Sequence, residues 1–313
     1  MNPDKSDAPF PDLPEGLHLL DLPQPKRGFQ QFIAAWFFVD DQGRRILIDP
    51  GPADTIPLLA EQLSKITDGV DYVLLTHIHL DHSGGLGQFC NLFKAKVLVH
   101  PKGRKHLLNP EKLWKASLDT LGDIAAMYGA PLPTPPDALL ESPALSGVTV
   151  LETPGHAPHH LSFIISFRKE RLFFTGEAAG LFLPVRQESG LPYLRPTTPP
   201  KFDGDAARTS LTETNCHLRD DDWFCYSHWG ALRKARRMVE LAQEQIEQWI
   251  AVTGRLRDRS EEEITEYLLQ NDPLLGGFTH LPEDLRERER LFIRNSVMGV
   301  RGYLNSGGPQ TRP

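Results

Sequence analysis

The stretch LLTHIHLDHSGG, residues 74–85, constrains this chain most, because three histidines and an aspartate fall within six consecutive positions after an apolar run. The preceding residues DYVLL are typical of a short buried strand. Side chains alternate along an extended segment, so His77 and His79 face one point. Asp81 and His82 follow where HSGG turns the chain into a helix, and they face a neighbouring point. Since imidazole and carboxylate groups are ligands for zinc, iron or manganese, the stretch predicts a metal site at a strand end.

One strand end cannot supply all the ligands that a metal ion needs, so further ligands are expected at the ends of other strands. Three residues follow β-like runs: His156 comes after VTVLETPG, Glu177 after RLFFTG, and His228 after WFCYS. With the first cluster they make five histidines and two carboxylates, which is enough for two metal ions. The alternative for Glu177 is a glutamate that only caps a turn, which would leave a mononuclear or asymmetric site.

The order of the expected elements indicates helices that cover sheets. Two strands are expected within 31–51, followed by a helix and the strand that delivers the histidine cluster, and this alternation continues to His100. A helical insert is expected at about 101–137. Strands return between 148 and 176 and again at 221–230, with a long loop and a helix between them. Beyond residue 230 the pattern is all helical, and Ser260 and Glu263 match a capping box.

Composition narrows the classes of protein that the chain can belong to. Hydrophobic residues make up 40% and charged residues 24% of its 313 residues, as in ordinary globular proteins. A net charge of −7 argues against a general nucleic-acid binder. The chain shows no apolar run long enough to span a membrane, and its polar, proline-rich residues 1–16 predict a flexible arm and not a signal peptide. With three cysteines that form no CxxC motif, these features predict a cytoplasmic protein.

The motif order HxHxDH, a Gly-His turn, an acidic residue after a glycine and a late single histidine resembles the metallo-β-lactamase-fold hydrolase superfamily. The resemblance covers about residues 17–230. TGEAAG, VHPKGRKHLLNPEKLW and SHWG are similar to a poorly characterised branch of metal-dependent hydrolases within it. The resemblance implies an α+β fold, a four-layer αββα sandwich that carries the catalytic domain at 17–230. Residues 231–313 would form a C-terminal helical extension.

The same resemblance implies roles for the candidate ligands. Asp49 in ILIDPG stands where the family has an aspartate that orients ligands by hydrogen bonding without binding metal, although a plain Asp-Pro-Gly turn explains it equally. Glu177 departs from the family, which usually has aspartate there, and its extra methylene adds roughly 1.5 Å of reach. The implied ligands of one ion are His77, His79 and His156, and those of the other are Asp81, His82 and His228, with Glu177 bridging both ions.

The expected function is hydrolysis of a small ester, lactone or thioester by hydroxide generated at two divalent metal ions, with Asp81 also orienting the nucleophile. Zinc is the first expectation, and iron or manganese are alternatives. A substrate pocket is expected from His160, Phe182, Tyr193, Arg195 and Trp229.

Two other functions stay open at this point: an iron-dependent oxidoreductase similar to sulfur dioxygenases, and a non-catalytic sensor that retains its metal site. The expected partner is a small molecule, with neither nucleic acid nor membrane. The helical tail either caps the site or makes a homodimer contact.

Overall fold

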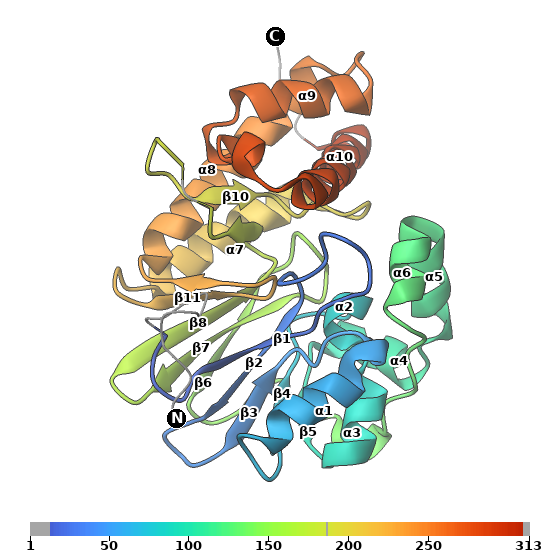
Figure 1. Cartoon of the computed structure of the whole chain (residues 1–313), viewed down its shortest axis with the longest axis vertical. Coiled ribbons are helices and arrows are strands. Elements are labelled where there is room, and N and C mark those ends of the chain that lie inside the picture. Colours follow the sequence, from blue (N-terminus) through green and yellow to red (C-terminus); the bar gives the residue numbers. More distant parts are fainter. Residues whose placement is uncertain (1–12, 186, 309–313) are drawn as a thin grey trace.

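Two mixed β-sheets lie face to face at the centre of the computed structural model (Figure 1), which describes residues 13–185 and 187–308. Residues 1–12 of the expected N-terminal arm, and residues 309–313, lie outside this range. The first sheet has the order β1 (His18–Asp21), β2 (Ala34–Val39), β3 (Arg45–Ile48), β4 (Tyr72–Leu74), β5 (Lys96–Leu98). The second has the order β12 (Ala231–Leu232), β11 (Trp223–Tyr226), β8 (Glu170–Gly176), β7 (Leu161–Phe167), β6 (Val148–Glu152).

Strand alternation explains why each sheet has one face toward the other sheet and one face toward helices. In β2, Trp36 and Phe38 belong to the apolar core between the sheets, whereas Ala35 and Phe37 belong to the core on the opposite face. The indole Nε1 of Trp36 donates a hydrogen bond to the carbonyl oxygen of Tyr226 at 2.8 Å, which joins the two sheets. Both faces of the strands are therefore buried.

Helices form the two outer layers. α1 (Ile56–Ser64) and α3 (Leu86–Phe93) pack through apolar side chains such as Leu59 on the first sheet. α7 (Gly204–His217) and α8 (Ala235–Arg255) cover the second sheet in the same way, through side chains such as Leu211. This arrangement confirms the expected four-layer sandwich.

The remaining helices belong to the insert and to the C-terminal region. The insert contains α4 (Pro101–Leu108), α5 (Glu111–Leu121) and α6 (Asp123–Met127), and the one-turn α2 (Leu80–Ser83) carries the second half of the histidine cluster. The C-terminal region continues with α9 (Glu261–Asn271) and α10 (Glu283–Asn305). Short 3-10 turns occupy Ala53–Thr55, Pro136–Ala138, Pro273–Leu275 and Phe278–His280. The predicted capping box is confirmed, since the Ser260 hydroxyl accepts from the Glu263 N–H while Glu263 accepts from the Ser260 N–H.

Two short strands replace part of the long loop that the sequence predicted. β9 (Leu181–Leu183) pairs antiparallel with β10 (Tyr193–Arg195) in a small separate sheet. Three-residue strands bounded by prolines have too little periodicity to be predicted from sequence. The hairpin matters because its second strand leads directly into Pro196 and then Thr197, which forms hydrogen bonds with His156 and Glu177.

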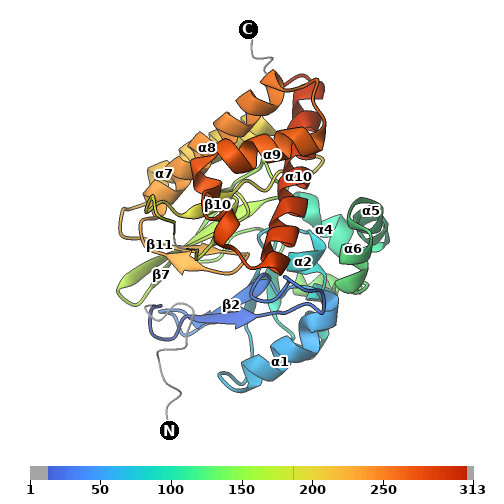
Figure 2. The same cartoon turned by 45° about the horizontal axis from the view of Figure 1, so that its top comes forward.

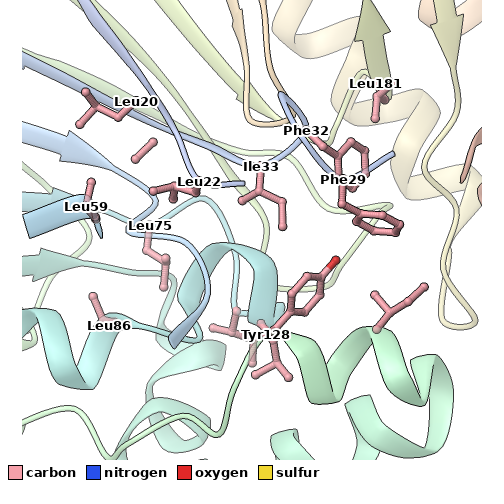
Figure 3. Packing of buried hydrophobic residues seen from close by; sticks show 14 of the residues in the cluster. Leu20, Leu22, Phe29, Phe32, Ile33, Leu59, Leu75, Leu86, Tyr128 and Leu181 are labelled. Atoms are coloured by element: carbon pink, nitrogen blue, oxygen red, sulfur yellow. The ribbon is translucent and has the colours of Figure 1, made fainter. Parts of the chain in front are cut away.

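The C-terminal helices share apolar cores with the sandwich. One core contains Phe29, Phe32 and Tyr128 together with Trp249 and Ile293 of the C-terminal helices, and Figure 3 shows part of it from close by. In Figure 2, α10 descends from the top of the molecule toward α2 and the loop before β2. The division of the chain at residue 230 stays a prediction. Across the described ranges, no helix is both long and apolar enough for a bilayer crossing.

Candidate metal centre

The predicted ligands meet at one edge of the sandwich, where several strands end. His77 and His79 follow β4, and His156 follows β6. Glu177 directly follows β8, and His228 lies two residues after β11. Because these strand ends lie at the same edge, residues up to 151 positions apart in sequence come together.

Three histidines and Glu177 form the first cluster. The Nε2 of His77 lies 3.0 Å from the Nδ1 of His79, and the Nε2 of His156 lies 2.9 Å from the same atom. The Oε2 of Glu177 is 3.3 Å from the Nε2 of His77 and 3.0 Å from that of His156. Four potential ligand atoms thus surround one point.

The second cluster shares Glu177 with the first. The Nε2 of His82 lies 3.6 Å from the Oδ2 of Asp81 and 3.4 Å from the Oε2 of Glu177. The Nε2 of His228 lies 3.5 Å from the Oδ2 of Asp81 and 3.4 Å from the Oε1 of Glu177. The carboxylate of Glu177 therefore presents atoms to both clusters.

These two groups fit divalent metal ions. Within each cluster the ligand atoms lie within 4.8 Å of one another. In a tetrahedral zinc site with bonds of about 2.0–2.1 Å, ligand atoms are roughly 3.3 Å apart, which matches the observed separations. The Nε2 of His82 is also a buried nitrogen with no hydrogen-bond partner, an arrangement that is costly unless a metal ion satisfies it. The donor set of imidazoles and carboxylates suits zinc, iron and manganese alike.

Hydrogen bonds on the outer nitrogens turn the Nε2 atoms toward the centre. The Nδ1 of His82 donates to the Oδ2 of Asp49 at 3.1 Å, and Asp49 belongs to neither cluster. The Nδ1 of His77 lies 3.0 Å from the hydroxyl of Thr76, which itself donates to Asp49 at 2.7 Å. Because Nδ1 carries the proton in this network, the Nε2 lone pair is free for a metal ion.

Backbone carbonyl groups do the same for the two histidines that come later in the chain. The Nδ1 of His156 donates to the carbonyl oxygen of Thr197 at 2.8 Å, and that of His228 donates to the carbonyl oxygen of Phe32 at 3.3 Å. The Phe32 ring also stacks on His228, with 4.6 Å between ring centroids. Each cluster thus contains one histidine that is oriented by a loop carbonyl.

The electrostatics of the cluster separate neutral from charged imidazoles. Burial and the neighbouring histidines lower the pKa of His77 well below its ordinary value and lower that of His79 to about 4. Burial alone would lower the pKa of His82, but Asp81, Asp49 and Glu177 outweigh it and raise this pKa. Burial would raise the pKa of Glu177, yet His156 and His228 hold it well below its ordinary value. In the metal-free protein, protons bound to some of these imidazoles therefore supply part of the positive charge that metal ions would supply.

His160 was expected beside a substrate, and its surroundings correct that expectation. The side chain is fully buried; its Nδ1 lies 2.7 Å from the hydroxyl of Thr153, and its Nε2 accepts from the backbone N–H of Glu177 at 3.0 Å. Gly176 has φ +60°, and a Cβ there would lie 2.4 Å from the His160 Nε2. His160 thus supports the turn that presents Glu177. Any residue other than glycine at position 176 would collide with the His160 ring.

The expected cation of the substrate pocket, Arg195, is not free for a substrate. Arg195 is 2% exposed, and its Nε donates to Glu289 of α10 at 2.8 Å. Tyr193 is fully buried and its hydroxyl lies 3.4 Å from the same carboxylate. Phe182 packs in the core beneath α7 and α8, stacked on Tyr226 at 5.6 Å. Burial thus corrects the expectation for these three residues, while Trp229 is also buried, beside His228 in sequence.

Sequence reasoning missed other residues that lie near the metal centre. Tyr128 follows α6 in the insert, and its hydroxyl points toward the side on which Phe29 and Phe32 lie (Figure 3). Burial, followed by the nearby carboxylates of Asp81 and Glu177, raises the pKa of Tyr128. No local pattern marks these residues, because they come from the insert and an irregular loop.

Comparison with known proteins agrees with the fold. The family model of the metallo-beta-lactamase superfamily matches residues 30–213. The chain is 31% identical over 182 residues to the metallo-beta-lactamase fold-containing protein ST1585 of Sulfurisphaera tokodaii. This aligned region covers 55% of this chain and 64% of that protein. The crystal structure of ST1585 aligns with a TM-score of 0.62 at 24% identity and covers 91% of this chain and 98% of that one.

Two enzymes are also among the similar proteins. An atrochrysone carboxyl ACP thioesterase of Pseudocercospora fijiensis is 31% identical over 143 residues, or 45% of this chain and 35% of that enzyme. A hydroxyacylglutathione hydrolase of Psychromonas ingrahamii is 29% identical over 143 residues, or 45% of each chain. The matches span less than two thirds of the length of each of these curated relatives. The family model matches more than half of the length of this chain. The chain therefore belongs to the metallo-beta-lactamase superfamily.

Proposed function

We propose that this chain is a metal-dependent hydrolase that cleaves a small ester, lactone or thioester with the help of two divalent ions. The observation that carries the proposal is the pair of ligand clusters that share Glu177. Zinc is the first expectation for both ions, and iron and manganese fit the same donors. The similarity to an ACP thioesterase and to a hydroxyacylglutathione hydrolase supports acyl compounds as the first substrates to test.

In this proposal the clusters hold one ion each. One ion would be bound by His77, His79 and His156. The other ion would be bound by Asp81, His82 and His228, and Glu177 would contribute to both sites. When bound, such ions lower the pKa of water toward neutrality and polarise a carbonyl oxygen. The five imidazoles and two carboxylates supply the fixed geometry that this chemistry needs.

Asp81 is proposed to orient the water nucleophile and to take up its proton. Its side chain is 17% exposed, whereas the side chains of Glu177, His82 and His228 are 7% exposed or less. His79 is likewise only half-buried. Substrate would therefore enter on the side of Asp81 and His79, where a carboxylate can meet both the nucleophile and the substrate.

Buried aromatic rings are proposed to keep the opposite side of the site dry. Phe32 covers His228, and Phe29 packs edge-on against Phe32 with 5.4 Å between centroids. A dry wall strengthens the electrostatic interactions of the ligands and keeps other water molecules away from the reacting carbonyl group.

The test is metal analysis of the freshly purified protein, followed by a panel of ester, lactone, thioester and phosphodiester substrates. We expect two metal equivalents per chain and turnover of at least one acyl substrate. His228→Ala should lose metal and activity, whereas His280→Ala, a change at a histidine outside both clusters, should lose neither. Full activity of His228→Ala would refute the proposal, and oxygen uptake without hydrolysis would favour an iron-dependent oxidoreductase instead.

A further inference from the structure

From the contacts of α10 we infer that this C-terminal helix positions both halves of the metal centre. It holds two irregular loops, residues 22–33 and 196–200, whose carbonyl groups orient His228 and His156. The inference rests on the proposed metal-dependent function and extends it to a helix that lies more than fifty residues beyond His228, the last candidate ligand.

The first contact of α10 is made by Arg288 to the loop that carries Phe32. Arg288 is 3% exposed, its Nη1 donates to the carbonyl oxygen of Gly28 at 2.5 Å, and its guanidinium lies 4.2 Å from the centre of the Phe32 ring. The helix and the loop are so close that a Cβ on Gly28 would lie 2.5 Å from the carbonyl oxygen of Asp284. The ring of Phe32 in turn stacks on His228, and the carbonyl oxygen of Phe32 accepts a hydrogen bond from the Nδ1 of His228. Arg288 therefore reaches the second cluster through one intermediate residue.

The second contact of α10 is made to the loop that follows β10. The hydroxyl of Ser296 donates to the carbonyl oxygen of Pro196 at 2.8 Å, and the hydroxyl of Thr198 donates to the carbonyl oxygen of Ser296 at 2.6 Å. Between these two loop residues, Thr197 accepts from His156 through its carbonyl group and donates from its hydroxyl to the carbonyl oxygen of Glu177 at 2.9 Å. The loop thus connects α10 to the first cluster.

A buried ion pair joins the two contacts. Glu289 is fully buried and accepts from Arg288 at 3.2 Å and from Arg195 at 2.8 Å. Arg195 is the last residue of β10 and begins the second loop. Buried charges are expensive unless they are paired, and a buried pair can impose a defined geometry on the elements it joins. In this helix they fix the spacing between the two loops that orient metal ligands.

Glycines of α10 offer a matched pair of substitutions. A Cβ on Gly299 would lie 1.8 Å from the carbonyl oxygen of Thr198, so alanine there must push the 196–200 loop away. A Cβ on Gly302, three residues later, would meet nothing closer than the carbonyl oxygen of Pro200 at 3.5 Å, an ordinary contact. Both changes add the same methyl group to the same helix, and only Gly299→Ala should disturb His156.

The experiment measures the affinity of the full-length protein for Zn²⁺ and Co²⁺ by chelator competition, at a temperature where circular dichroism shows every variant to be folded. Loss of an outer hydrogen-bond partner typically weakens metal affinity about 10- to 100-fold. We expect such a loss for Gly299→Ala and affinity within about twofold of the wild type for Gly302→Ala. If Gly299→Ala does not fold, Ser296→Ala removes one hydrogen bond without adding atoms and should show a smaller loss in the same direction.

A second pair of variants tests the contact made by Arg288. Arg288→Met removes the donor to Gly28 and leaves Arg195 to pair with Glu289, so no buried charge is orphaned. Arg290→Met is the control, because the side chain of Arg290 is 41% exposed on the same helix and pairs with Glu262 and Glu266 of α9, away from both loops. Arg288→Met should weaken binding of the second Co²⁺ equivalent, while Arg290→Met should not.

Nitrogen-15 spectra of the histidine rings in the metal-free protein provide a readout that needs no metal. The Nδ1 protons of His156 and His228 should be protected from exchange in the wild type and exposed in Gly299→Ala and Arg288→Met, respectively. Folded variants with unchanged affinity and unchanged ring spectra would overturn the inference. Failure of the wild type to bind metal, with the ring protection as expected, would refute the proposed function and not the role of α10 in positioning these rings.

Discussion

Replacement of Asp49 by asparagine should damage metal binding without altering the backbone. Asp49 is 1% exposed and has φ +52°, a left-handed conformation that asparagine tolerates well. Its Oδ1 accepts from the N–H of Thr76 at 2.8 Å. Its Oδ2 accepts from the hydroxyl of Thr76 at 2.7 Å, from His82 at 3.1 Å and from the hydroxyl of Ser227 at 3.1 Å. Asparagine has the same shape as aspartate, but it lacks the negative charge and has one acceptor oxygen where the carboxylate has two.

The size of the effect follows from these four hydrogen bonds. In the better orientation, the new amide group faces the N–H of Thr76 and leaves that buried donor unpaired, at a cost of about 1–3 kcal/mol. The other three bonds lose their charge assistance, at about 1 kcal/mol each. We therefore expect a loss of roughly 4–6 kcal/mol in the free energy of unfolding. Because His82 loses its charged partner, metal affinity should fall about 10- to 100-fold.

Thermal unfolding and chelator competition together test this reasoning. Asp222→Asn is the matched control, because Asp222 is also buried and pairs with Arg171 at 3.0 Å, away from the metal centre. The control should lower stability and leave metal affinity unchanged. If Asp49→Asn bound metal as tightly as the wild type, the carboxylate would not orient His82, and the reasoning would be refuted.

Three further predictions follow from individual side chains. Despite burial, Asp81, Asp49 and Glu177 raise the pKa of His82, so protons compete with the metal ion for its Nε2 and metal affinity should weaken as the pH falls; chelator competition at several pH values should detect this, and an affinity that does not change with pH would contradict the prediction. Tyr128→Phe removes a hydroxyl group near Asp81 and Glu177, and it should lower kcat/KM about tenfold on a panel substrate at unchanged metal content; unchanged kinetics would exclude a role for the hydroxyl group. Burial raises the pKa of Asp21 to about 6, so the folded state prefers the protonated form and loses stability as the pH rises from 3.8 to about 6. Asp21→Asn should therefore raise the Tm at pH 7, with the gain vanishing below about pH 4, and an equal gain at both pH values would show that the ionisation of Asp21 is not the cause.

Much of the fold could be predicted from the sequence because its signals are local. The nearly continuous apolar runs AAWFFV and LSFIISF are typical of strands that are buried on both faces, and Ser260 with Glu263 marks a helix start. The density of imidazoles in HIHLDH indicated metal chemistry for the same reason. Strand ends are also predictable positions, which is why His156, Glu177 and His228 could be singled out before any geometry was known.

The substrate pocket and the role of the C-terminal helix could not be predicted in this way. Arg195 looked like a free cation because its partner, Glu289, lies 94 residues later in the chain. His160 looked like a substrate contact because nothing in the sequence shows that its ring accepts from the backbone of Glu177.

The sequence by itself determined which residue types could bind metal and at which strand ends they would lie, because those properties depend on side-chain chemistry and short-range periodicity. Only the tertiary structure decided which side chains were already committed to partners. It also decided that loop carbonyls held by α10 orient His156 and His228. The physical reason is that hydrogen bonds and buried ion pairs depend on distances of about 3 Å between segments whose separation along the chain carries no information about proximity.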